Sequence, residues 1–254
     1  MCSQAVGDSG GLILDQLHKV CLRITRITRA MADRRVLFFG DSLVAGVGDP
    51  VGLGWVGRVV AASFGAGLPV TGYNLSVRGE TSVQIGSRWR QETRARFGPG
   101  ADTRVVLSFG TNDATIAGGQ RRVGEDGSCG AVRVILERAA MIGVPAFVVG
   151  PAPVDDPEQN RRIQALSVAF GNVCAARGTP FVSVVESLLA SHVWRGQVAH
   201  GDGAHPAAEG YEALAQLVLA SGWTDWLARE TMDSHARQLR QVGARIGQAR
   251  RQPA

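Results

Sequence analysis

The chain has 254 residues, of which 45% are hydrophobic and 19% are charged, proportions that fit a globular protein and exclude fibrous and compositionally disordered classes. The net charge of +5 is uneven, because residues 1–35 sum to +3, residues 229–254 sum to +4 and the body between them sums to −2. We therefore interpret the basic ends as solvated tails and expect no nucleic-acid partner.

Short apolar runs rich in β-branched residues alternate with longer helical patterns along the chain. The runs are typical of strands that are buried on both faces, whereas apolar residues at three- and four-residue spacing predict helices. Five strands are predicted, at Val36–Phe39, Val70–Leu75, Val105–Phe109, Ala146–Val149 and Phe181–Val185. Five helices are predicted, at Gly54–Phe64, Ser82–Phe97, Cys129–Ile142, Pro157–Arg177 and Ala207–Ser221.

This alternation predicts an α/β fold of three layers, α/β/α, built on a five-stranded parallel sheet. Sheets of this kind bind ligands at the carboxyl ends of their strands. We expect residues 1–30 to be a poorly ordered N-terminal extension, residues 31–223 to form one domain, and residues 224–254 to form a basic C-terminal helix and tail.

A serine motif, Gly40-Asp41-Ser42-Leu43, follows the first predicted strand. A serine in this place presents its hydroxyl at the carboxyl edge of the sheet, and Gly40 permits a tight backbone turn. Taken alone, the motif is also consistent with a simple helix cap made by Asp41 or Ser42.

Two further polar segments follow the second and third predicted strands. Gly79, within Asn74–Thr81, lets a backbone N–H approach a ligand closely. Asn112, within Gly110–Asp113, offers a side-chain amide donor of the kind found in oxyanion holes, and Asp113 is expected to hold the loop. Each segment alone is an ordinary turn composition.

A histidine motif, Asp202-Gly203-Ala204-His205-Pro206, precedes the last predicted helix. The carboxylate can accept from one ring nitrogen of His205 and leave the other nitrogen free to take a proton from a serine. His192 and His200 are expected to be loop residues without such a role.

Together the four segments resemble the SGNH (GDSL) hydrolase family, from about Val36 to Leu217. The resemblance implies a flavodoxin-like SGNH hydrolase fold and a serine hydrolase that cleaves small acyl esters or thioesters through an acyl-enzyme. It implies the following roles: Ser42 as nucleophile, His205 as base, Asp202 orienting the base, an oxyanion hole from the N–H of Ser42, the N–H of Gly79 and the side chain of Asn112, and Asp41 and Asp113 in support. It requires no cofactor and no metal.

Alternatives remain on the sequence alone. The same site could transfer an acyl group to a sugar or another alcohol, or the chain could be a non-catalytic binding module that keeps the fold. The acyl length, the leaving group and the oligomeric state stay open. Residues considered as neighbours of the substrate are Val44, Val47, Trp55, Arg78, Thr111, Ala114, Pro153 and Val154.

The cysteines bear on location and metal binding. Cys2, Cys21, Cys129 and Cys174 form no C-x-x-C pair and lie away from histidines, so no structural metal site is expected. Cys174 lies in an apolar helical pattern and is predicted to be buried. Reduced thiols, together with the lack of an 18-residue apolar run or a convincing secretory signal, favour a cytoplasmic protein.

Overall fold

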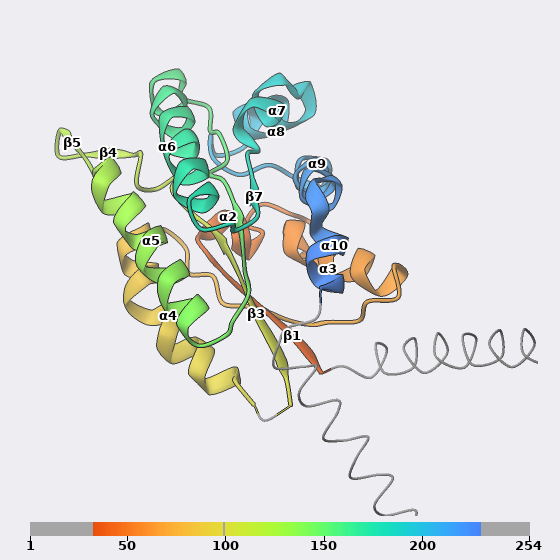
Figure 1. Ribbon diagram of the computed structural model, residues 1–254. Coiled ribbons are helices and arrows are strands. Elements are labelled where there is room, and N and C mark those ends of the chain that lie inside the picture. The colour runs from red at the N-terminus through yellow and green to blue at the C-terminus, as the bar shows by residue number, and fades with distance from the viewer. Residues whose placement is uncertain (1–32, 99, 230–254) are drawn as a thin grey trace, which may run out of the picture. The chain divides into compact units, whose positions relative to one another are not determined.

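The computed structural model describes residues 33–98 and 100–229 (Figure 1). The predicted N-terminal extension, Cys2, Cys21 and nearly all of the predicted C-terminal helix lie outside these residues. Within the described part of the chain, none of the helices combines the length and the hydropathy needed to cross a bilayer.

The central sheet has five parallel strands in the order β2-β1-β3-β6-β7, which confirms the predicted sheet. Their bounds are Arg34–Gly40 for β1, Thr71–Asn74 for β2, Asp102–Ser108 for β3, Ala146–Val149 for β6 and Phe181–Val182 for β7. The chain first extends the sheet on one side of β1 and then returns to its other side. The carboxyl ends of β1 and β3 therefore form the switch point at which such sheets bind ligands.

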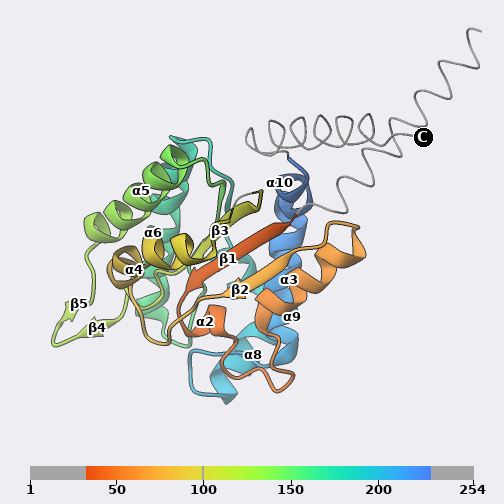
Figure 2. The ribbon, with the colours of Figure 1, turned by 90° about the horizontal axis from the view of Figure 1, so that it is seen from below.

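Helices cover both faces of the sheet, which completes the predicted three layers (Figures 1 and 2). One face carries α4 (Ser82–Arg96), α5 (Glu125–Met141) and α6 (Pro157–Ala175). The other carries α3 (Gly54–Gly65), α9 (Ala208–Val218), the π-helical turn Leu219–Trp223 and α10 (Thr224–Ala228). Shorter elements are α2 (Ser42–Ala45), the hairpin of β4 (Ile116–Ala117) and β5 (Gln120–Arg121), α7 (Val185–Ala190) and α8 (His192–His200).

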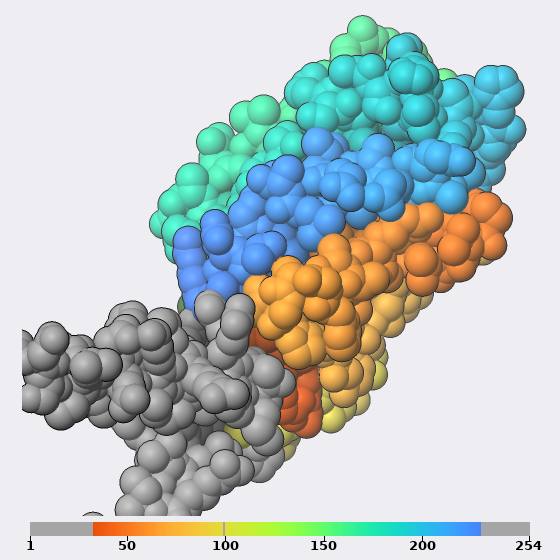
Figure 3. Space-filling view, turned by 90° about the vertical axis from the view of Figure 1, so that its right-hand side faces the viewer, coloured from red at the N-terminus to blue at the C-terminus, as the bar shows by residue number. Residues whose placement is uncertain are grey.

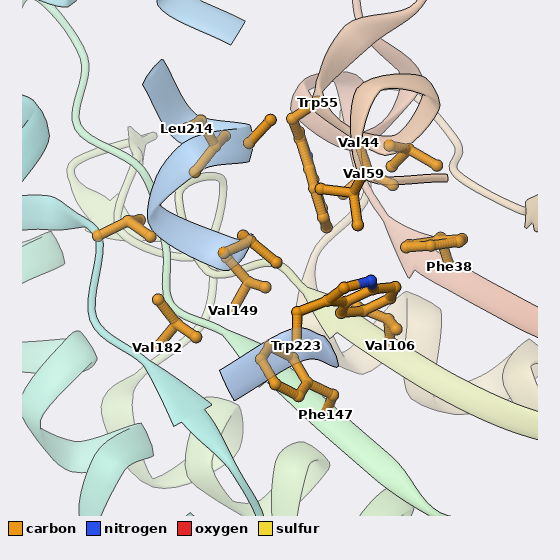
Figure 4. Packing of buried hydrophobic residues seen from close by; sticks show 14 of the residues in the cluster. Phe38, Val44, Trp55, Val59, Val106, Phe147, Val149, Val182, Leu214 and Trp223 are labelled. Carbon is orange, nitrogen blue, oxygen red and sulfur yellow. The ribbon is translucent and has the colours of Figure 1, made fainter. Parts of the chain in front are cut away.

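Successive residues of β1 enter the two opposite cores, as the two-residue period of a strand requires. Val36 and Phe38 pack under α3 and α9, whereas Leu37 and Phe39 pack under α4 and α5. The first core is rich in aromatic rings: the centroid of the Phe38 ring lies 5.8 Å from Trp55 and 6.0 Å from Trp223 (Figure 4). Burial on both faces explains why β1 has no alternating polar pattern.

The core includes residues that follow position 223. Trp226 and Leu227 are buried in the same core as β1. The guanidinium of Arg104, in β3, donates to the backbone carbonyls of Trp226 and Arg229 and lies over the Trp226 ring. α10 ends at Ala228, and Arg229 has extended backbone.

Three local predictions are wrong. The last strand stops at Val182, and Val185 begins α7 instead. His192 and His200 are the two ends of α8 rather than loop residues; Ser191 caps the start of this helix, because its hydroxyl accepts from the N–H of Trp194. Cys174, in contrast, is fully buried in α6 as predicted.

Candidate active site

The hydroxyl of Ser42 and the ring of His205 meet at the carboxyl edge of the sheet. His205 Nε2 lies 2.7 Å from Ser42 Oγ, and His205 Nδ1 lies 2.7 Å from Asp202 Oδ2. The structure thus brings together three side chains separated by up to 163 positions in sequence. In this geometry the imidazole can accept the proton of the serine hydroxyl, and the carboxylate can accept from the imidazole.

The turn that carries Ser42 requires a close approach between two stretches of backbone at Gly40. A Cβ at this position would lie 2.2 Å from Val44 Cγ2 and 2.3 Å from the carbonyl oxygen of Ser108, so only glycine fits. Asp41 then caps α2, because its Oδ1 accepts from the N–H of Leu43 at 3.0 Å. Ser42 is the first residue of α2. The interpretation of the motif as a helix cap is therefore compatible with its interpretation as the site of a nucleophile.

His205 packs against the turn that follows α2. A Cβ on Gly48, whose φ is +87°, would lie 2.9 Å from the carbonyl oxygen of Pro206 and 3.3 Å from His205 Cβ. The neighbouring carbonyl of Val47 accepts from the Tyr211 hydroxyl at 2.7 Å, which ties this turn to α9. The sequence shows Gly48 as part of a glycine-rich turn after Ser42 but did not indicate its contact with His205, and it gave no signal for Tyr211.

The carboxylate of Asp202 is held in its charged form. Burial works against ionisation, but hydrogen bonds from the His205 side chain and from the N–H groups of His205 and Ala204 outweigh it and lower the pKa of Asp202 to about 2. The loop is fixed to its neighbour by the N–H of Asp155, which donates to the carbonyl of Gly203 at 2.8 Å. At neutral pH the carboxylate is therefore ready to orient the imidazole.

Asn112 contacts both the serine motif and the turn that contains Gly79. Asn112 Nδ2 donates to Asp41 Oδ2 at 3.1 Å and to the carbonyl of Glu80 at 3.0 Å, so both amide hydrogens have acceptors in this structure. Gly79 has a φ of +77°, and open space surrounds the position of its missing Cβ. The geometry thus links the serine motif, through Asp41, to the loop after β3 and to the turn after β2.

Asp113 is buried and joins two helices to this loop. Its Oδ1 accepts from the N–H of Ser82 at the start of α4 at 2.9 Å, and its Oδ2 accepts from the Ser128 hydroxyl in α5 at 2.7 Å. Both carboxylate oxygens are therefore used in holding the loop that carries Asn112.

Asp41 is a buried carboxyl with an unusual protonation. Burial raises the pKa of Asp41 to about 7; the bond from the Leu43 N–H opposes the rise, the nearby charge of Asp113 adds to it, and the bond from Asn112 opposes it. A folded-state pKa above the unfolded value of about 4 means that stability is full below about pH 4 and is lost as the pH rises through about 7.

We expect Asp41→Asn to remove this loss. The difference in melting temperature, variant minus native, should become more positive between about pH 5 and about pH 8. Thermal unfolding followed by circular dichroism at several pH values measures it, with the exposed Asp155→Asn as the matched control. A difference for Asp41→Asn that is flat with pH, like that of the control, would contradict the assignment.

Four of the residues considered as substrate neighbours are parts of the core instead. Their side chains are buried, with at most 7% exposure, because they pack beneath the site: Val44, Trp55, Thr111 and Ala114. Arg78 is exposed, and Pro153 and Val154 line a pocket of about 660 Å³ between the β6–α6 loop and α8. Since Asp155 also lines it and bonds to Gly203, the pocket lies beside the Asp202–His205 loop.

No group of three or more histidine, cysteine, aspartate or glutamate side chains in the described part of the chain is arranged to hold a metal ion.

Residues 38–213 match the model of the GDSL-like lipase/acylhydrolase family, which spans the strands, the serine motif and the histidine motif described above. The chain belongs to this family. As a GDSL-like lipase/acylhydrolase it is a carboxylic ester hydrolase. No curated protein sequence matches the chain closely enough to count as a relative.

Solved structures share the fold of this GDSL-like hydrolase. A lipase/acylhydrolase from Enterococcus faecalis is 24% identical, with a TM-score of 0.63 over 74% of this chain and 95% of that one. The acetylxylan esterase Axe2 from Geobacillus stearothermophilus is 17% identical, with a TM-score of 0.63 over 80% of this chain and 97% of that one. At these identities the likeness establishes the fold.

Proposed function

We propose that the chain hydrolyses esters or thioesters of small acyl groups through an acyl-enzyme on Ser42. The observation that carries the proposal is the pair of 2.7 Å contacts that join Ser42 Oγ to His205 and His205 to Asp202. A serine hydroxyl is a weak nucleophile until a base takes its proton, and this contact supplies the base.

The steps follow from the roles of the three groups. Ser42 Oγ attacks the acyl carbonyl while His205 Nε2 takes its proton, and Asp202 stabilises the imidazolium that forms. His205 then gives the proton to the leaving alcohol or thiol, and the acyl group remains on Ser42. A water molecule, deprotonated by His205 in turn, releases the acid and restores the serine.

Two backbone donors support an oxyanion hole. Ser42 is the first residue of α2, so its N–H is one of the donors that a helix start leaves unpaired. The N–H of Gly79 has no acceptor among the residues that the structure describes, and the space beside it is open. Asn112 would complete the hole by turning one amide hydrogen from Glu80 or Asp41 to the oxyanion.

A spacing within a structural neighbour is consistent with these roles. Catalytic mutants of Axe2 replace an aspartate and a histidine that stand three positions apart, and Asp202 and His205 have the same spacing. The acetylxylan substrate belongs to that enzyme, and we carry over only the catalytic pair.

The test combines covalent labelling with a substrate series. A fluorophosphonate probe should modify the native protein, and peptide mass spectrometry should find the adduct on Ser42 rather than on Ser76, a half-buried serine in the loop after β2. Release of p-nitrophenol from acetate, butyrate and octanoate esters then reports acyl length, and an added alcohol as acceptor reports acyl transfer. An adduct elsewhere, or none together with no ester hydrolysis, would defeat the proposal.

A further inference from the structure

A tight turn carries the Gly79 N–H. The N–H of Glu80 donates to the carbonyl of Val77 at 3.3 Å, which closes a four-residue turn with Gly79 in third place. The positive φ of Gly79, +77°, is what the third position of a type II turn requires. The turn begins firmly, because the N–H of Val77 donates to the carbonyl of Gly40 at 3.1 Å, next to the serine motif.

Two side chains from one segment bind two consecutive carbonyls of this turn. Arg122 donates from its guanidinium to the carbonyl of Gly79 at 2.8 Å, and Asn112 donates to the carbonyl of Glu80 at 3.0 Å. Both residues belong to the segment between β3 and α5, which also forms the projecting β4–β5 hairpin (Figure 1).

The base of that hairpin is fixed, so the backbone of Arg122 is firmly anchored while its side chain is exposed. The N–H of Arg122 donates to the carbonyl of Thr115 at 2.9 Å, and the N–H of Val123 donates to the carbonyl of Asp113 at 3.3 Å. Asp113 is itself buried and bonded to α4 and α5. A chain of contacts therefore runs from the core to the Gly79 carbonyl.

During the reaction the bond from Asn112 to the turn must change, whereas the bond from Arg122 need not. If Asn112 turns an amide hydrogen toward the oxyanion, it loses or shares its bond to Asp41 or to the Glu80 carbonyl. The bond from Arg122 to the Gly79 carbonyl can stay in place during the reaction. A guanidinium has several donors, and the Gly79 carbonyl oxygen is not a reacting atom. The turn then depends most on Arg122 at the moment when the Gly79 N–H is needed.

We infer that Arg122 is a positioning residue for the oxyanion hole: it holds the Gly79 peptide so that the N–H of Gly79 stays directed at the developing oxyanion. The inference rests on the proposed function of Ser42. The Gly79 N–H stabilises charge that develops only in the transition state. Its displacement by a fraction of an ångström should therefore lower kcat and leave KM unchanged.

The experiment compares Arg122→Ala, Arg122→Met and Arg122→Lys with the native protein, using p-nitrophenyl acetate. We expect kcat to fall by roughly 10-fold to 100-fold in the alanine and methionine variants, with KM unchanged within about twofold. Lysine keeps a charged donor on a similar stem, so it should recover part of the rate. Affinity for a trifluoromethyl ketone, which forms a tetrahedral oxyanion on the serine, should fall in parallel with kcat.

Arg121→Ala is the matched control, because Arg121 is the exposed neighbour on β5 and its loss should leave kcat as in the native protein. Circular dichroism melting curves show whether each variant is folded. A native kcat in folded Arg122→Ala would overturn the inference, as would a rise in KM confined to anionic esters, which would make Arg122 a substrate contact. Loss of the proposed function looks different: the native protein itself would then show no hydrolysis and no labelling of Ser42.

Discussion

Ser42→Ala is expected to lower kcat for p-nitrophenyl acetate by about 10⁶-fold and to abolish labelling by a fluorophosphonate. Alanine removes the only atom that forms the acyl bond, while the backbone N–H at position 42 and the packing of α2 remain. The residual rate over water would come from the oxyanion donors and from binding alone. Steady-state rates at saturating ester, with active-site concentration from the native burst, measure the ratio.

His205→Ala should lower kcat by a similar factor. The double variant, with alanine at both positions 42 and 205, should be no slower than either single variant, because nucleophile and base act as a unit. His200→Ala is the matched control, since His200 is an exposed histidine at the end of α8 and should keep the native rate. If the fold-losses in kcat of the two single variants multiply in the double variant, the two side chains do not act on the same proton.

Asp202→Asn is expected to lower kcat by roughly 10⁴-fold with little change in fold. The substituted side chain keeps an oxygen for the N–H groups of Ala204 and His205, so the loop retains its shape. Its amide, however, donates to His205 Nδ1, and the ring proton then stands on Nε2. A nitrogen that already carries a proton cannot accept the one on Ser42.

Measurement of kcat at neutral pH and of the imidazole tautomer by nitrogen NMR tests this prediction. Asp155→Asn changes an exposed carboxylate on the adjoining loop in the same way and should be close to native. A kcat for Asp202→Asn within about threefold of the native value would show that the His205 tautomer is not set by Asp202.

A purely apolar strand was predicted to its ends, and a strand that contains charges was not. Ala146–Val149 was predicted to its ends because the run is purely apolar. β3 begins three residues earlier than predicted, at Asp102, because Asp102 and Arg104 are buried and bonded to each other. A pattern of apolar residues cannot reveal a buried ion pair, since each charge alone reads as the end of a strand.

Two small elements were missed for opposite reasons. The β4–β5 hairpin had a signal that went unused: Gly118 and Gly119, both with positive φ, form a two-residue hairpin turn. α8 had little signal, because its sequence mixes a central Gly196 with β-branched residues; it is held by the burial of Trp194 and Val198. Tertiary packing decides such a helix, and packing is not visible in one sequence.

The residues of the candidate site were predictable as types, and their mutual contacts were not. The sequence contained Ser42, Asn112 and His205 in recognisable motifs, but nothing indicated that Asp41 accepts from Asn112. Arg122 had no motif at all. Its bond to the carbonyl of Gly79 depends on how the hairpin leaves β3, which is a property of the folded chain.

The docking of α9 on α3 has a consequence for biosynthesis. His205 lies just before α9, and these two helices run as adjacent bands on one face of the molecule (Figure 3), with Arg58 of α3 3.3 Å from Glu212 of α9. The spacing of Ser42 and His205 thus depends on a helix that leaves the ribosome after all five strands of the sheet. A nascent chain would carry an inert Ser42 until α9 has docked, so its capacity to react with acyl groups would begin only when nearly the whole body has been synthesised.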